Sequence, residues 1–214
     1  EGMVAAKQLM ILPQDPSAGD AKTIIRSINE NEGIEFTWSV WMFIDDMQYN
    51  EGRYKHIFHK GNDNNLLSNK PSGINEPNNA PGMYIAPYTN TLVVIMNTFH
   101  EITEKVEIPN IPINKWVCVQ ARVEGRTMDV YINGTLARRH ILKSLPKQNY
   151  GNVYTGMNGG FDGYLSNMRY YDYAIETREI DKILKEGIEL INLSPRPTKN
   201  DKTNYLSTSW FGLN

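Results

Sequence analysis

The polar run Asn62-Asp63-Asn64-Asn65 places four oxygen-bearing side chains next to one another. Carboxylate and amide oxygens are the ligands that a hard cation such as Ca²⁺ prefers, so Asp63 is a candidate metal ligand. Asp162, which lies between Gly160 and Gly163, is a second candidate. The spacing is not that of an EF-hand loop. Side chains of this kind also bond to their own backbone, and an ordinary polar turn is the alternative at both places.

A sugar-binding site can be assembled from another set of side chains. Sugar recognition needs a flat aromatic ring to pack on the C–H face of the sugar and a few amide or carboxylate groups to bond its hydroxyls, all on an exposed rim. Four tyrosines lie next to predicted turns, and the asparagine-rich loop at 61–82 supplies amides. Binding is expected at the rim loops around residues 61–82 and 150–163. Each tyrosine has the alternative of packing in the core. The candidate glycan-binding residues are Asn62, Asp63, Asn64, Asn65, Asn78, Asn79, Tyr84, Tyr88, Tyr150 and Tyr154.

Two histidines, His56 and His59, form a His-x-x-His pattern that suggests a metal site. In a strand, residues three apart point to opposite faces of the sheet, so these side chains cannot share an ion unless the strand contains a bulge. We therefore expect one packed and one exposed histidine. No nucleophile, base and orienting group can be assigned together, and the sequence predicts no catalytic residue.

The stretch from Trp116 to Asn133 shows what kind of element positions these side chains. Apolar residues alternate with others up to a polar turn, a second strand follows, and Asn133-Gly134 is the residue pair that best tolerates a type I′ turn. The pattern predicts antiparallel strands with one buried face, and Cys118, on the other face, is expected to act as a small buried hydrophobe. The residues of the buried face are Val117, Val119, Ala121 and Val123.

Further strands are predicted along most of the chain, and one short helix near its C-terminal end. Ile180, Ile183 and Leu184 recur at helical spacing, and Gly187 is placed to end the helix. The other expected strands are an edge strand at 9–12, then 34–45, 53–60, 82–87, 91–98, 106–108, 135–139 and 164–171. This order predicts an all-β fold, an antiparallel β-sandwich with one short C-terminal helix.

Composition narrows the classes of protein to consider. With 214 residues, 40% of them hydrophobic, the chain fits one domain at residues 1–190 and a C-terminal tail at 191–214 that packs on the domain or contacts a partner. A net charge of −2 removes the basic surface that nucleic-acid binding requires. No apolar run is long enough to span a bilayer. Because the chain opens on Glu1, an anchor upstream of it is a further expectation.

Four segments together resemble the laminin G-like, concanavalin A-like jelly-roll domains. They are Phe36–Trp41, Ile57–Gly61, Trp116–Gly134 and Gly160–Ile175, and their order along the chain matches that family over roughly residues 30 to 187. The resemblance implies a jelly roll in which recognition is left to the loops. Longer stretches of sequence, Ile57–Asn62, Asn158–Asn167 and Tyr205–Phe211, are similar to domains of this family found in large DNA viruses of algae and protists.

The resemblance implies a non-catalytic carbohydrate-binding or adhesion module located on a virion, on a cell surface or outside the cell. Its expected partner is a glycan or polysaccharide. A structural virion protein that contacts other virion proteins is the alternative, and a polysaccharide hydrolase or lyase is a third, minor one.

Two departures from relatives of this fold bear on chemistry. Retaining glucanases carry Glu-x-Asp-x-x-Glu on one strand, whereas the Glu-x-Asp of this chain, Glu179-Ile180-Asp181, falls on the predicted helix and is followed by Leu184. Many relatives hold Ca²⁺ with an Asp early in the closing strand, where this chain has Ser166 and Asn167. Ca²⁺ is thus a candidate cofactor only through Asp63 and Asp162.

Overall fold

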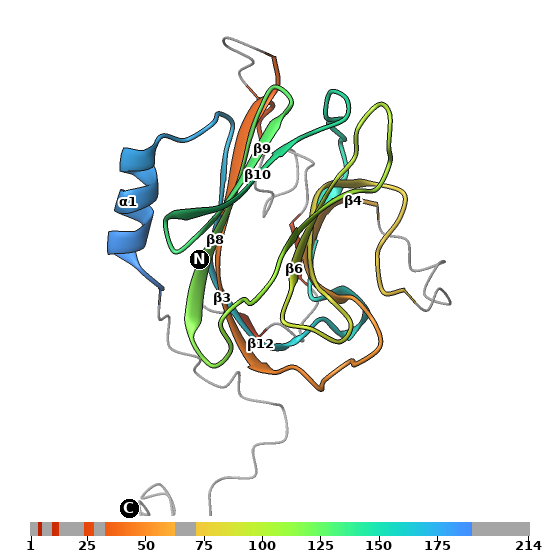
Figure 1. Cartoon of the computed structure of the whole chain (residues 1–214), viewed down its shortest axis with the longest axis vertical. Coiled ribbons are helices and arrows are strands. Elements are labelled where there is room, and N and C mark those ends of the chain that lie inside the picture. Colours follow the sequence, from red (N-terminus) through yellow and green to blue (C-terminus); the bar gives the residue numbers. More distant parts are fainter. Residues whose placement is uncertain (1–3, 6–9, 13–23, 28–32, 63–71, 190–214) are drawn as a thin grey trace, which may run out of the picture.

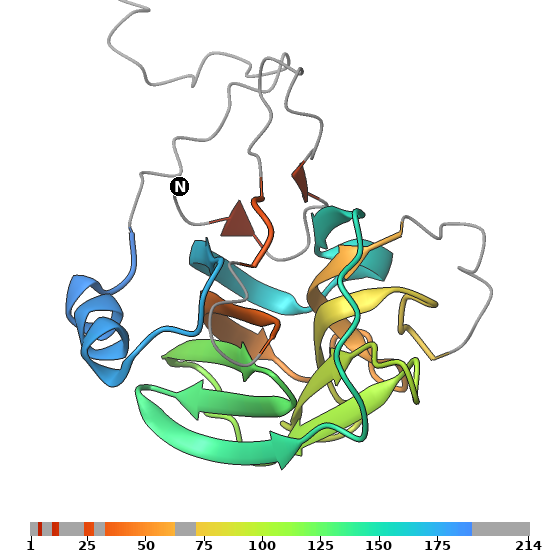
Figure 2. The same cartoon turned by 90° about the horizontal axis from the view of Figure 1, so that it is seen from above.

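The computed structural model describes residues 4–5, 10–12, 24–27, 33–62 and 72–189, and they form two antiparallel sheets packed face to face (Figures 1 and 2). Sheet A has the strand order β1-β12-β3-β8-β9-β10, and sheet B has the order β2-β11-β4-β5-β6-β7. The strands of sheet A are β1 (Val4–Ala5), β3 (Glu35–Asp46), β8 (Trp116–Glu124), β9 (Thr127–Ile132), β10 (Thr135–Ile141) and β12 (Asp162–Tyr171). Those of sheet B are β2 (Met10–Leu12), β4 (Lys55–Gly61), β5 (Asn79–Ile85), β6 (Leu92–Met96), β7 (Glu104–Ile108) and β11 (Asn152–Thr155).

A single apolar core lies between the sheets, and strand alternation places its members there. In sheet A the inward residues of β8 pair in register with those of β3, for example Val119 with Val40 and Val117 with Met42. Sheet B contributes β6, whose five residues are all buried, with Leu92, Val94 and Met96 in this core. The antiparallel β-sandwich predicted from the sequence is therefore confirmed, with the four predicted β8 residues in the core.

The outer face of sheet A is also covered, because helix α1 (Thr177–Glu186) packs across it (Figure 1). The helix lies where the spacing predicted one, and its residues Ile180 and Ile183 are buried against Cys118 of β8. Strand β8 is thus buried on both faces, whereas its alternation had indicated one. Burial raises the pKa of the Cys118 thiol to about 12, so the side chain behaves as a small packing group, as expected.

The N-terminal edge strand predicted at residues 9–12 corresponds to β2, which pairs with β11 at the edge of sheet B. The tail at 191–214 lies outside the described residues, so its contacts stay a prediction. A short 3₁₀ turn, η2 (Met157–Gly159), joins β11 to β12. Within the described part of the chain, no helix has the length and apolar character needed to cross a bilayer.

The core predicts a large difference between two leucines. Leu92 on β6 is fully buried, whereas Leu136 on the edge strand β10 is 42% exposed. We expect Leu92→Ala to lower the free energy of unfolding by about 2 to 5 kcal/mol through lost burial and the cavity left behind. Leu136→Ala should change it by about 0.5 kcal/mol or less. Urea denaturation of both variants measures the difference, and equal losses would contradict this position of the core.

Candidate functional site

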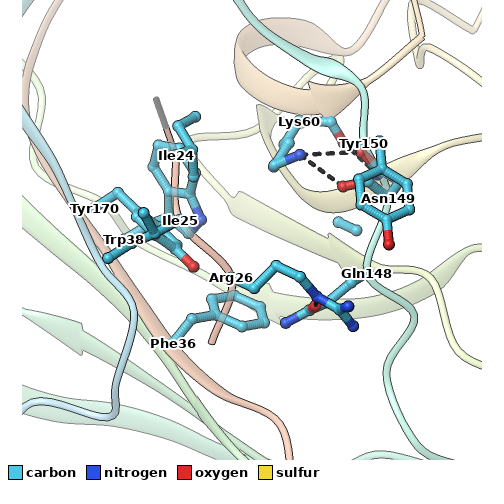
Figure 3. Close-up of a pocket in the computed structure, with 11 residues that line it drawn as sticks. Ile24, Ile25, Arg26, Phe36, Trp38, Lys60, Gln148, Asn149, Tyr150 and Tyr170 are labelled. Atoms are coloured by element: carbon cyan, nitrogen blue, oxygen red, sulfur yellow. Dashed lines mark hydrogen bonds between the residues drawn. The ribbon is translucent and has the colours of Figure 1, made fainter. Parts of the chain in front are cut away.

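A hollow of about 60 Å³ lies at one end of the sandwich, where segments from both sheets and two connecting segments meet (Figure 3). The segments 24–26 and 148–150 form its rim, and the inner sides of β3, β4, β5 and β12 form its floor. The residues that line it are Ile24, Ile25, Arg26, Phe36, Trp38, Lys60, Ala80, Gln148, Asn149, Tyr150 and Tyr170. It therefore combines an aromatic floor with a polar rim.

The floor is rigid because its aromatic rings belong to the core. Trp38 is 2% exposed, and its ring centroid lies 4.9 Å from that of Tyr170 and 5.2 Å from that of Phe58. Tyr170 of β12 is brought beside Trp38 by direct strand pairing. Burial, and the nearby charge of Asp172, raise the pKa of Tyr170 to about 12, so its hydroxyl stays protonated at neutral pH.

Lys60 reaches into the hollow from the end of β4 and holds the rim in place (Figure 3). Its Nζ donates to the backbone oxygen of Asn149 at 2.7 Å and to that of Gly151 at 2.9 Å. The Asn149 amide returns a hydrogen bond to the backbone oxygen of Lys60. Burial lowers the pKa of this ammonium to about 8, because no carboxylate among the lining residues offsets the loss of water.

Four of the side chains that line the hollow are exposed, namely those of Ile25, Arg26, Gln148 and Tyr150. The Arg26 Nε donates to the Gln148 side-chain oxygen at 3.3 Å, which joins the two rim segments across the opening. Tyr150 follows Asn149 directly and is 81% exposed. The site thus offers a flat ring, an amide and a guanidinium around an aromatic floor, which is the chemistry needed to hold a sugar.

The structure brings only part of the predicted glycan-binding set to this hollow. Tyr150 lines it directly. Asn62 and Asn78 are joined by a side-chain hydrogen bond. They lie at the same end of sheet B, because Asn62 follows Lys60 by two residues and Asn78 precedes Ala80 by two. Asp63, Asn64 and Asn65 lie outside the described residues. Tyr88 is exposed but sits near Gly52, at the opposite end of β4 and roughly 20 Å away by strand length.

Three members of the predicted set are buried and cannot contact a sugar as they stand, so the expectation is wrong for them. Asn79 and Tyr84 are fully buried, and the Tyr84 hydroxyl donates to the Asn79 side-chain oxygen at 2.6 Å. Tyr154 is 6% exposed and stacks on the ring of His59, with centroids 5.2 Å apart. The Asn75 N–H donates to the Tyr84 hydroxyl, and the Asn79 amide donates to the Asn75 backbone oxygen, which joins the segment before β5 to this strand.

The expectation that His56 and His59 face opposite sides is also wrong. The pairing of β4 with β5 shifts register between His56 and Phe58, which marks a bulge between the two histidines, and a bulge reverses the side-chain alternation. Both imidazoles are buried, and His56 Nε2 lies 2.8 Å from His59 Nδ1. Because the backbone N–H of Met157 donates to His56 Nδ1, the His56 proton sits on Nε2 and is donated to His59. His59 Nε2 then donates to the backbone oxygen of Asn62.

The candidate metal ligands are not assembled into a site in the described part of the chain. Asp162 begins β12, where it pairs in register with Asp46, at the end of the strand opposite Tyr170. Within the described ranges, no three His, Cys, Asp or Glu side chains gather closely enough to hold an ion. At the position where relatives place a Ca²⁺ ligand, Ser166 and Asn167 instead bond the backbone of Glu189 and Gly187, so these residues do not fit the ion. Ca²⁺ binding at Asp63 stays a prediction.

Arg26, Lys60 and Gln148 were missed by the sequence analysis as site residues. They come from three segments that are far apart in the chain, and no local spacing relates them. A usable signal was the lysine that follows the apolar pair Ile57-Phe58 in β4, since a charge at such a position must find partners when the strand is buried.

Comparison with known proteins supports the same fold. A family model described as the concanavalin A-like lectin/glucanases superfamily, Laminin_G_3, matches residues 18–181. No curated protein matches the chain.

Among solved structures, the receptor binding domain of botulinum neurotoxin D is similar, with a TM-score of 0.57 at 13% identity over 84% of this chain and 47% of that chain. The botulinum neurotoxin serotype G binding domain has a TM-score of 0.57 at 12% identity over 86% of this chain and 46% of that one. The C/D mosaic receptor binding domain has a TM-score of 0.56 at 14% identity, over 72% and 36%. The chain spans less than half the length of these binding domains, and likeness at such identity shows the fold alone.

The histidine pair predicts a loss of stability in acid. Burial, and next the charge of His59, hold the pKa of His56 well below its usual 6.5 in the folded state, whereas the unfolded chain takes up a proton near pH 6.5. The unfolded state therefore binds more protons as the pH falls below 6.5, and acid favours unfolding by up to about 1.4 kcal/mol per pH unit. We expect this slope to be smaller in His56→Gln and unchanged in His100→Gln, which alters an exposed histidine. Denaturant titrations between pH 7 and 4.5 measure it, and equal slopes in all three proteins would refute the assignment.

Proposed function

The chain belongs to the concanavalin A-like lectin/glucanases superfamily as a laminin G-like domain, and from this membership we propose that it is a non-catalytic module that binds carbohydrate. The binding site in this proposal is the hollow between the segments 24–26 and 148–150. A glycan carried by a cell-surface receptor is the partner, and the module acts outside the cell or on a particle surface. The virion as that particle is supported by the resemblance of Ile57–Asn62 and Asn158–Asn167 to viral segments.

The observation that carries the proposal is the position of Tyr150. Its ring is 81% exposed, yet the adjacent Asn149 is fixed to β4 by Lys60 on one side and by its own amide on the other. An exposed aromatic on a fixed backbone loses little conformational freedom when a ligand packs on it. Gln148 and Arg26 lie beside it and supply donors and acceptors for hydroxyl groups.

The absence of acid–base partners at this hollow supports a binding function rather than cleavage. None of the described residues that line it is an aspartate or glutamate, and glycoside hydrolysis uses a pair of them. Glu179 and Asp181 lie on α1, on the outer face of sheet A, as the sequence predicted for that helix. Release of reducing sugar from any bound polysaccharide would contradict this part of the proposal.

Replacing Tyr150 tests the site. We expect Tyr150→Ala to weaken glycan binding about tenfold, because a stacked ring contributes beyond its buried area. The matched control is Tyr88→Ala, which removes an equally exposed tyrosine at the other end of sheet B and should leave the affinity unchanged. Binding is screened on a glycan array and quantified by calorimetry with the strongest ligand.

The two tyrosine variants also give the result that would count against the hollow. Equal loss in both variants, or loss in Tyr88→Ala alone, would place the binding surface elsewhere. Thermal unfolding of both proteins serves as the control for folding, since both side chains are on the surface and contribute little to the core.

A second candidate function, contact with other proteins in an assembly, is favoured by an exposed apolar patch. Phe99, Ile102 and Leu145 are 69%, 53% and 50% exposed, and the Phe99 N–H donates to the Leu145 oxygen, so the two loops that carry them are held together. Lys147 lies over the Phe99 ring, 5.1 Å from its centroid. Clustered exposed apolar side chains of this kind mark interaction surfaces.

The patch predicts an effect on self-assembly. If the chain packs against its own copies in a particle, Phe99→Glu should abolish concentration-dependent association, because it places a charge in an apolar contact. His100→Glu adds the same charge to a neighbouring exposed position and should reduce association less. Sedimentation velocity over a concentration series measures both, and a wild-type chain that stays monomeric throughout would remove this candidate.

A further inference from the structure

The hollow is positively charged, although the net charge of the whole chain is −2. Two of its lining residues, Arg26 and Lys60, are cations, and among the described lining residues none is acidic. A site for a neutral sugar needs hydrogen-bonding groups but no net charge. Carbohydrate binding alone therefore does not explain why the charged residues that line the hollow are both cations. Several cations elsewhere in the described residues are paired with carboxylates, as Arg139 is with Asp129 and Lys143 with Glu101.

Arg26 keeps most of its donors available to a ligand. Its Nε donates to the Gln148 side-chain oxygen, and this is its one hydrogen bond within the described residues. Gln148 holds the side chain across the opening, with the guanidinium beside the mouth of the hollow (Figure 3). The planar guanidinium fork matches the geometry of a carboxylate or sulfate, which accepts two parallel hydrogen bonds from it.

Lys60 adds a charge that is solvated by dipoles alone. Its ammonium bonds the backbone oxygens of Asn149 and Gly151 and, at 3.4 Å, the Asn149 side-chain oxygen. These carbonyl groups satisfy its protons but carry no net charge. Burial therefore lowers its pKa to about 8, and an anion entering the hollow would lessen that cost.

We infer that the hollow selects sugars that carry an acidic group, a carboxylate or a sulfate, with the anion placed between Arg26 and Lys60. The inference rests on the proposed function and adds the ligand class to it. The sugar ring lies on the rim against Tyr150, and the acidic substituent points inward. Arg26 bonds the anion directly, and Lys60 contributes its electrostatic field from the floor.

Matched pairs of glycans test the inference on the whole chain. One pair compares polygalacturonate with its methyl ester, a second compares a sulfated galactan with its desulfated form, and a third compares sialyllactose with lactose. We expect the acidic member of at least one pair to bind tenfold or more tightly than its neutral partner, since charge-assisted bonds are about twice as strong as neutral ones. The pair that responds separates a carboxylate from a sulfate.

Two variants separate a built site from general charge attraction. Arg26→Gln should reduce the preference for the acidic member at least tenfold, whereas Arg53→Gln removes the same charge from an exposed position at the far end of β4 and should leave the preference intact. An equal effect of the two substitutions would overturn the inference, because it would show attraction by net charge. Thermal unfolding of both variants confirms that each is folded.

The outcomes for the two proposals can be told apart. Equal affinity for the acidic and neutral members of every pair, with binding still lost in Tyr150→Ala, would overturn the acidic ligand and leave the carbohydrate-binding function standing. Binding to no member of the panel would count against both. An acidic preference that persists in Arg26→Gln would place the anion elsewhere and overturn the site proposed for it.

Discussion

One buried ammonium joins the two parts of the candidate site. The Nζ of Lys60 is surrounded by oxygens of Asn149 and Gly151, and a charge taken out of water must keep such partners. The segment 148–151 therefore cannot leave the end of β4 without leaving the ammonium unsatisfied. Gly151 allows the approach, because a Cβ at that position would lie 2.1 Å from the Gly61 oxygen. The rim and the exposed tyrosine depend on this contact, whereas the aromatic floor is held by the core.

Much of the fold could be predicted because it follows from strand alternation and turn chemistry, which are local. The hairpin from Trp116 through Asn133-Gly134 forms β8, β9 and the turn into β10, and the predicted helical spacing gave α1. What alternation could not show was coverage by distant elements. Cys118 is buried on the outer face of β8 because a helix sixty residues later packs there. Strand β11, in a segment dominated by turn residues, also exists through its pairing with β2 and β4.

The site was harder to predict than the fold, and the reasons are physical. Tyr150, which lines the hollow, was a recognisable candidate because it is an aromatic residue beside a glycine in a turn-rich segment. Tyr84 and Asn79 have the same residue types but lie on a strand whose residues are all buried, and composition does not distinguish them. The histidine pair was misjudged because the bulge between His56 and Phe58 depends on the pairing of β4 with β5. Arg26 and Gln148 meet across more than a hundred residues, so their contact is a property of the topology.

Cys118 is the sole cysteine in the sequence, and it lies beneath α1 with a raised pKa. A thiol reacts as its thiolate, so this one should be nearly inert toward alkylating and maleimide reagents while the protein stays folded. The described surface consequently offers no competing thiol when an engineered cysteine is labelled. A fluorophore or spin label attached to a cysteine engineered beside the hollow would occupy a single position, and its signal would report ligand arrival without correction for a second probe.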